Sequence, residues 1–111
     1  MSDVIVVVVL QAKPGAGPAL RELMVASAQN THTETGCLTY ALHTDNDDPD
    51  RIALVERWAD QTALDAHLQQ PYLRKLFADL EDVLAAAPTT AFCSALPAGD
   101  PVKGILAGSL G

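Results

Sequence analysis

The sequence predicts a single α+β domain of the ferredoxin-like type, with the element order β-α-β-β-α-β. Three observations indicate this fold. A β-branched apolar run covers residues 4–12, two alternating runs cover 37–44 and 51–58, and apolar residues at helical spacing lie on each side of that pair. We therefore expect a four-stranded antiparallel sheet with the helices on one face.

A turn separates the first strand from the first helix. Residues 4–12 are apolar on both faces, which is typical of a central strand, and a Lys-Pro-Gly sequence at 13–15 ends the run. Pro18 suits the first turn of a helix, and the apolar spacing predicts that this helix covers 15–33. Gly36 then follows, and glycine can take the positive φ that often ends a helix.

The middle of the chain reads as a β-hairpin. Residues 37–44 alternate in polarity, with Leu38 and Tyr40 expected on one face of the strand. Residues 51–58 alternate in the same way. The acidic sequence at 45–50 between these runs is typical of a polar turn.

A second helical region and a last strand complete the pattern. Asp60 is a suitable N-cap, and Pro71 is expected to divide the helical region into two pieces. The last strand is expected at 89–96. The ferredoxin-like domain then covers residues 1–96, and the Gly- and Pro-rich tail at 97–111 is expected to be an extended arm or a frayed end.

Charge and composition restrict the partners. Acidic residues outnumber basic residues by 14 to 7, which gives a net charge of −7. A nucleic acid or an anionic membrane requires a basic surface, so we expect neither as a partner. The sheet face without helices needs a cover, and in so short a chain we expect a homodimer with two-fold symmetry.

The sequence also favours a cytoplasmic location. The apolar run at 4–10 is too short to span a bilayer, and the acidic residues 1–3 lack the positive flank of a signal peptide. Cys37 and Cys93 are the two cysteines of the chain, and their number and separation do not suggest a disulfide framework. We expect both thiols to be reduced.

Most sequence motifs of catalysis are absent. The chain contains no Gly-rich phosphate loop, no CxxC pair and no HExxH motif. Its three histidines do not have the spacing of metal ligands. We therefore expect no metal site.

The candidate catalytic residues are Glu56, Trp58 and His67. Strand alternation puts Glu56 and Trp58 on one side of the sheet, and helical spacing puts His67 on the helix face that packs down. The three side chains are expected to line one space between sheet and helix. A carboxylate and an imidazole in such a space could act as acid and base.

Each of these residues also has a purely structural interpretation. Trp58 could fill the core, and His67 could be a core histidine with a hydrogen-bond partner. Burial of the Glu56 carboxylate is costly unless the group is neutral or paired, and Arg57, Arg74 or His67 could be its partner.

Three further residues are candidates for substrate binding. Tyr40 and Tyr72 offer phenol hydroxyls, and Asn30 lies near the end of the first helix, where it could reach the mouth of a pocket. The alternative is that both tyrosines place their hydroxyls at the surface and that Asn30 faces solvent.

Several segments, taken in order, match a known family. They are residues 4–15, the segment 35–40, the Glu-Arg-Trp sequence at 56–58 with the Ala-Leu pair and His67 that follow it, and the Pro-Tyr pair at 71–72. On the order of these segments, the chain resembles the antibiotic biosynthesis monooxygenase domain family, and the resemblance covers roughly residues 3–96. The resemblance implies a homodimer in which two sheets pack into a dimeric α+β barrel.

Some members of this family oxidise quinols or aromatic polyketides with O₂ and use neither flavin nor metal. The resemblance therefore implies a cofactor-independent monooxygenase acting on a quinol or phenol. Trp58 would stack on the substrate ring, His67 would take the phenolic proton, and Glu56 would orient or charge His67. Leu54 and Leu64 replace an asparagine and a tyrosine of anthrone-oxidising members, which disfavours anthrone as the substrate.

Two alternatives remain open at the level of sequence. The same acid–base pair could serve an isomerase or another proton-transfer enzyme acting on a small carbonyl compound. The chain could also be a non-enzymatic dimer that binds a small molecule, with Glu56 and His67 serving the fold.

Overall fold

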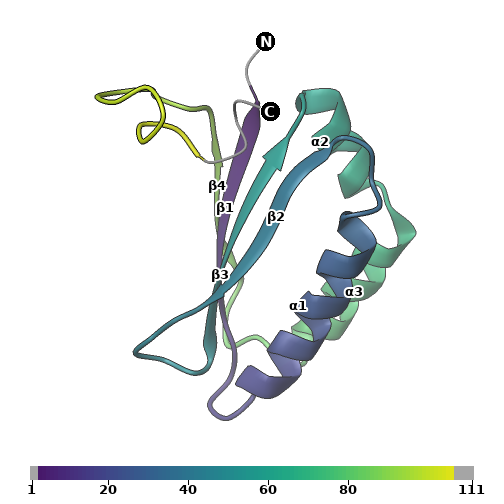
Figure 1. The fold of residues 1–111 in the computed structure, drawn as a ribbon. Coiled ribbons are helices and arrows are strands. Elements are labelled where there is room, and N and C mark those ends of the chain that lie inside the picture. Colours follow the sequence, from purple (N-terminus) through teal and green to yellow (C-terminus); the bar gives the residue numbers. More distant parts are fainter. Residues whose placement is uncertain (1–2, 107–111) are drawn as a thin grey trace.

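The computed structural model describes residues 3–106, which form an antiparallel sheet with helices on one face (Figure 1). The elements are β1 (Val4–Gln11), α1 (Gly17–Thr31), β2 (Cys37–Thr44), β3 (Arg51–Trp58), α2 (Gln61–Leu68), α3 (Pro71–Glu81) and β4 (Thr89–Cys93). The strand order is β2-β3-β1-β4, so β1 is central as predicted. The ferredoxin-like fold is confirmed, and Pro71 begins the second helical piece.

Strand β2 departs from simple alternation at its start. A β-bulge lies between Cys37 and Thr39, and Cys37 pairs with Trp58. Leu38 was expected on the same face as Tyr40, but it is 47% exposed, so that expectation is wrong. The extra residue of a bulge shifts the alternation of the side chains that precede it.

Helix α1 is capped by a distant part of the chain. Its N-cap residue, Ala16, makes no side-chain hydrogen bond to the helix. Instead the Asp50 carboxylate, in the turn between β2 and β3, accepts hydrogen bonds from the backbone N–H groups of Gly15 (3.1 Å) and Gly17 (2.9 Å). A negative charge at a helix N-terminus also interacts favourably with the helix dipole. The acidic turn therefore fixes where α1 begins.

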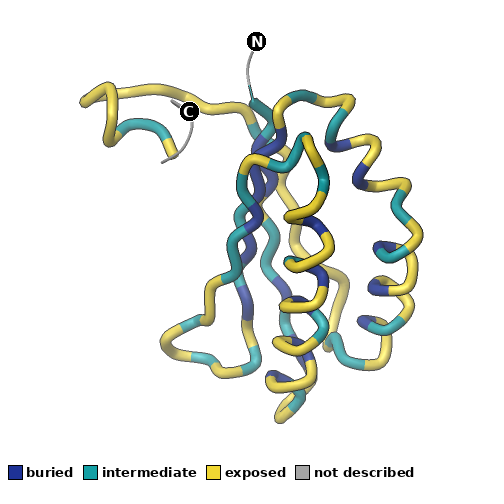
Figure 2. The backbone as a smooth tube through the Cα atoms, turned by 45° about the vertical axis from the view of Figure 1, so that its right-hand side comes forward, coloured by how far each residue is buried: buried dark blue, intermediate teal, exposed yellow. Residues whose placement is uncertain are grey.

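The core lies between the sheet and the helices (Figure 2). Each large aliphatic side chain that is fully buried there contributes about 1.5–3 kcal/mol to folding. Strands β1 and β3 supply one side of this core, and α1 and α3 supply the other; the buried aliphatic residues include Val6, Leu10, Leu20, Met24, Leu54, Leu73 and Leu80.

A close contact places α2 against the loop that precedes β2. A Cβ atom built on Gly36 would lie 2.3 Å from the Cβ atom of Ala63 in α2. Among the described residues, positive φ occurs at Gly15 and Gly99, so Gly36 does not have the positive φ expected from the sequence. The glycine is required because no side chain fits between the loop and α2.

No helix within residues 3–106 covers the second face of the sheet (Figure 1). Val7 on that face is 38% exposed. Strand β4 ends at Cys93 rather than at residue 96, and the chain beyond it runs away from the sheet as an arm. The homodimer remains a prediction. Within the described ranges, none of the helices combines the length and apolar character needed to cross a membrane.

We predict that Asp50→Ala lowers the free energy of unfolding by about 1–2 kcal/mol, because two N–H groups at the start of α1 lose their acceptor. Urea denaturation measures the change. Asp47→Ala is the matched control, since it removes an exposed carboxylate from the same turn and should cost less than about 0.5 kcal/mol. Equal losses in the two variants would contradict the capping role of Asp50.

We predict that Gly36→Ala destabilises the fold by about 1–3 kcal/mol, since the new methyl group overlaps Ala63. Adding Ala63→Gly should recover part of this loss, although glycine alone costs a helix about 1 kcal/mol. A double-mutant cycle by urea denaturation measures the coupling. Strictly additive losses would show that the two positions do not touch.

Candidate active site

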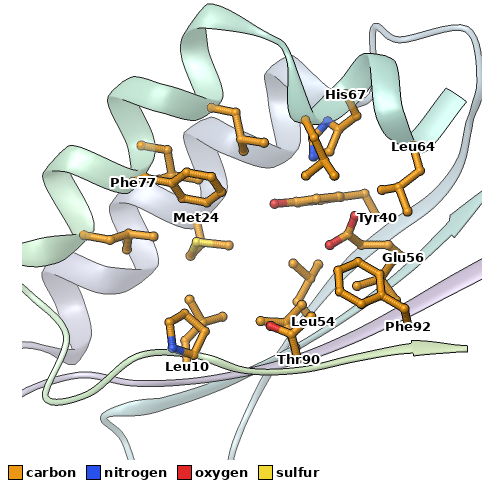
Figure 3. Close-up of a pocket in the computed structure, with 17 residues that line it drawn as sticks. Leu10, Met24, Tyr40, Leu54, Glu56, Leu64, His67, Phe77, Thr90 and Phe92 are labelled. Atoms are coloured by element: carbon orange, nitrogen blue, oxygen red, sulfur yellow. The ribbon is translucent and has the colours of Figure 1, made fainter. Parts of the chain in front are cut away.

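A cavity of about 170 Å³ lies between the sheet and the helices (Figure 3). Most of its wall is apolar and comes from β1, β3, α2 and α3. Tyr40, Glu56 and His67 lie together at one end, and Thr90 lines the side formed by β4. Two of the candidate catalytic residues, Glu56 and His67, therefore share the space that the sequence predicted between sheet and helix.

His67 is held at one ring nitrogen and free at the other. It lies in the last turn of α2, which begins at the predicted N-cap Asp60. Its Nδ1 atom is 2.7 Å from Oε2 of Glu34. A carboxylate can only accept a hydrogen bond, so Nδ1 carries the proton and Nε2 is an acceptor in the neutral ring. Within residues 3–106, no group is hydrogen bonded to Nε2.

Glu34 is the site residue that the sequence analysis missed. It lies in the irregular loop between α1 and β2 and accepts hydrogen bonds from both His67 and the Tyr72 hydroxyl. Burial and the neighbouring Glu34 carboxylate raise the pKa of Tyr72 to about 12. A glutamate in a polar loop has no periodic pattern that would mark it as functional, so only the folded chain brings it to His67.

Glu56 and Trp58 form a hydrogen-bonded pair below His67. The Trp58 Nε1–H group donates to Oε1 of Glu56 at 2.9 Å. Burial raises the pKa of Glu56, while the Trp58 hydrogen bond and the nearby His67 oppose that rise. Trp58 is fully buried, and its ring centroid lies 4.5 Å from that of His67. Trp58 supports His67 and Glu56 but does not form part of the cavity wall.

The two arginines that were proposed as charge partners of Glu56 lie elsewhere, whereas the third candidate, His67, lies near it. Arg57 belongs to the opposite face of the sheet and pairs with Asp3. Arg74 is exposed on α3. Among the described residues, the hydrogen-bond partner of Glu56 is therefore the indole of Trp58 rather than an arginine.

The three candidate substrate-binding residues occupy different places. Tyr40 lines the cavity, but its hydroxyl is 2.9 Å from Oγ of Ser27, and burial raises its pKa to about 12. Tyr72 lines a separate hollow next to Glu34. Asn30 is exposed on α1. Only Tyr40 of these three residues contacts the cavity.

The site offers acid–base chemistry rather than a set of metal ligands. Within residues 3–106, no group of three or more His, Cys, Asp or Glu side chains is arranged to hold a metal ion. Both thiols, of Cys37 and Cys93, are free. The functional groups that face the cavity are an imidazole nitrogen that can accept a proton and a carboxyl group with a raised pKa.

Comparison with known protein sequences identifies the family. The family model for antibiotic biosynthesis monooxygenases matches residues 3–79. A Mycobacterium tuberculosis protein named "Putative monooxygenase Rv0793" is 32% identical over 83 residues, which cover 75% of this chain and 81% of that protein. An uncharacterized Synechocystis protein is 29% identical over 72 residues, and the chain spans about half of its length (49%).

Solved structures agree with this assignment. The structure of the same Mycobacterium tuberculosis protein superposes with a TM-score of 0.81 at 28% identity and covers 89% of this chain and 100% of that one. A structure described as an antibiotic biosynthesis monooxygenase has a TM-score of 0.79 at 26% identity and covers 85% of this chain and 99% of that one. The chain therefore belongs to the antibiotic biosynthesis monooxygenase family.

Proposed function

We propose that the protein is a monooxygenase that oxidises a small quinol or phenol with O₂ and requires neither flavin nor metal. The observation that carries this proposal is the arrangement of His67, whose Nδ1 is held by Glu34 while its ring lines an apolar cavity. The family assignment and the name of the Mycobacterium tuberculosis relative support the reaction class.

The first step is the removal of the phenolic proton. A substrate hydroxyl in the cavity donates to Nε2 of His67, and proton transfer leaves a phenolate and an imidazolium. Glu34 stabilises the imidazolium through the 2.7 Å hydrogen bond to Nδ1, and the C-terminal end of α2 adds a favourable dipole. A positioned general base of this kind typically accelerates a reaction by about 10²–10⁴-fold.

The phenolate supplies the electrons for the reduction of oxygen. In the overall reaction, one hydroquinone and one O₂ give one hydroxyquinone and one water, and the atoms on the two sides balance. One oxygen atom forms a C–O bond on the ring, and the other leaves as water with two hydrogens from the substrate. The substrate provides all four electrons, so no external reductant is needed. The apolar wall keeps water away from the reacting ring.

Glu56 and Trp58 have supporting roles in this mechanism. The raised pKa of Glu56 favours its protonated form relative to an ordinary carboxyl group, so it can donate a proton to the departing oxygen. Trp58 fixes Glu56 through its indole N–H and His67 through ring contact. It acts here as a positioning residue instead of the ring-stacking surface that the family resemblance implied.

We also propose that the protein works as a homodimer in the cytoplasm. The sheet face opposite the helices carries Val7, Val9 and Val55, and Val7 is 38% exposed. Pairing two such faces would remove both from water, and two-fold symmetry makes one face complementary to its own copy.

A proton-transfer enzyme is the second candidate. Glu56 and His67 face the same cavity, and one of them has a raised pKa, so they could shuttle a proton between two atoms of a carbonyl substrate. An isomerase of this kind consumes no O₂. An oxygen electrode therefore distinguishes it from the monooxygenase.

We predict that His67→Ala lowers kcat for oxygen uptake with methylhydroquinone by about 10²–10⁴-fold, because the general base is removed. Gln69→Ala, an exposed position just after the same helix, should leave kcat unchanged. Circular dichroism checks that both variants are folded. Undiminished oxygen uptake by folded His67→Ala would exclude His67 as the base.

We predict that Glu56→Gln raises the free energy of unfolding at pH 7. The folded state raises the pKa of Glu56 above its ordinary value of 4.5. The carboxyl group therefore ionises less readily in the folded than in the unfolded chain, and the wild type loses stability as the pH rises above 4.5 and through the folded pKa. Glutamine can still accept the Trp58 hydrogen bond but does not ionise.

The gain measured by urea denaturation should therefore shrink as the pH falls below 4.5, the ordinary value of the group. Glu22→Gln on the exposed surface of α1 is the control and should show no such dependence. A Glu56→Gln variant that is less stable than the wild type at pH 7 would contradict the burial cost assigned to Glu56.

A further inference from the structure

The cavity continues into a groove on the surface of the protein. This groove, of about 530 Å³, runs along the end of α3 and the segment that leads to β4. Its wall shares Phe77, Leu80, Pro88 and Thr90 with the cavity. The two hollows therefore adjoin along these four side chains.

The cavity has the size of one aromatic ring. An apolar protein cavity of about 150 Å³ holds a benzene molecule, and the cavity here has a volume of about 170 Å³. A substrate with two or three fused rings would not fit inside it. Any further part of a ligand must lie outside the cavity, and the groove is the hollow that adjoins it.

The lining changes from polar at the His67 end of the cavity to apolar on the side of the groove. Tyr40, Glu56 and His67 lie at the inner end (Figure 3). At the mouth, where the cavity meets the groove, Phe77 lines both hollows and is 54% exposed. The inner end therefore suits a polar head group, and the mouth suits an apolar tail.

The charges of the lining residues disfavour an anion. Among the described residues, neither hollow is lined by a lysine or an arginine. Glu56 lines the cavity and Glu81 lines the groove. A carboxylate or phosphate on the ligand would lose water without gaining a fixed cation, which is energetically costly.

We propose that the ligand is an uncharged single-ring phenol or hydroquinone with an apolar tail. The ring lies in the cavity with its hydroxyl at His67, and the tail lies in the groove against Phe77, Leu84 and Ala86. The identity of the head group rests on the proposed function, while the tail and its groove go beyond it.

Anaerobic titration of the full-length protein with 4-alkylphenols tests this proposal. Trp58 is the only tryptophan of the chain and contacts His67, so its fluorescence reports binding at the inner end. From 4-methylphenol to 4-hexylphenol, each added methylene should lower Kd by about two- to fourfold. 4-Hexylbenzoate should bind at least tenfold more weakly than 4-hexylphenol. Affinity that is independent of tail length would overturn the proposal.

A matched pair of variants locates the tail. Ala86→Asp places a carboxylate in the groove and should weaken binding of 4-hexylphenol by at least tenfold. Ala85→Asp changes the neighbouring exposed residue, which does not line the groove, and should leave this Kd unchanged. Equal effects of the two variants would contradict a tail in the groove. A second result would also contradict it. If affinity does not depend on tail length and Ala86→Asp changes the oligomeric state measured by sedimentation, a second copy of the chain covers the groove instead of a ligand tail.

Oxygen uptake separates this proposal from the proposed function. Tail-dependent binding without oxygen uptake by any alkylhydroquinone would support the groove and contradict the monooxygenase. Oxygen uptake with an affinity that ignores tail length would support the monooxygenase and contradict the groove. Failure of the protein to bind any phenol would contradict both.

Discussion

The hydrogen bond between Nδ1 of His67 and Oε2 of Glu34 is the contact on which the site depends. Because the carboxylate can only accept, it places the ring proton on Nδ1 and leaves Nε2 as an acceptor. The neighbouring contacts maintain this bond. Gly36 lets α2 approach the loop that carries Glu34, Tyr72 binds the same carboxylate oxygen, and Trp58 packs against the imidazole.

The same contact explains how a small apolar fold can hold reactive polar groups. Each buried polar group has a partner that satisfies part of its hydrogen-bonding capacity: Glu34 binds two donors, and Glu56 accepts from Trp58. The atoms left over, Nε2 of His67 and the second oxygen of Glu56, belong to side chains that line the cavity. The cost of burying these groups is thus partly offset, while their chemistry stays available to a ligand.

Local periodicity was enough to predict the fold and part of the site. Alternation along β3 and helical spacing in α2 predict the sides on which Glu56 and His67 lie, because each pattern repeats over a few residues. Glu34 could not be found in this way, since it lies in a loop without a period. The bulge at Leu38 also depends on one inserted residue that no local pattern marks. The position of Trp58 outside the cavity wall depends on His67 lying over it, which is a tertiary contact.

The protonation state of His67 tests the central claim most directly. Nitrogen-15 NMR of the imidazole at neutral pH distinguishes a protonated ring nitrogen from a bare one. The account predicts a protonated Nδ1 and a bare Nε2, with the Nε2 signal shifting when 4-methylphenol is added. A neutral ring protonated at Nε2, or an Nε2 signal that does not respond to the phenol while Trp58 fluorescence reports binding, would contradict it.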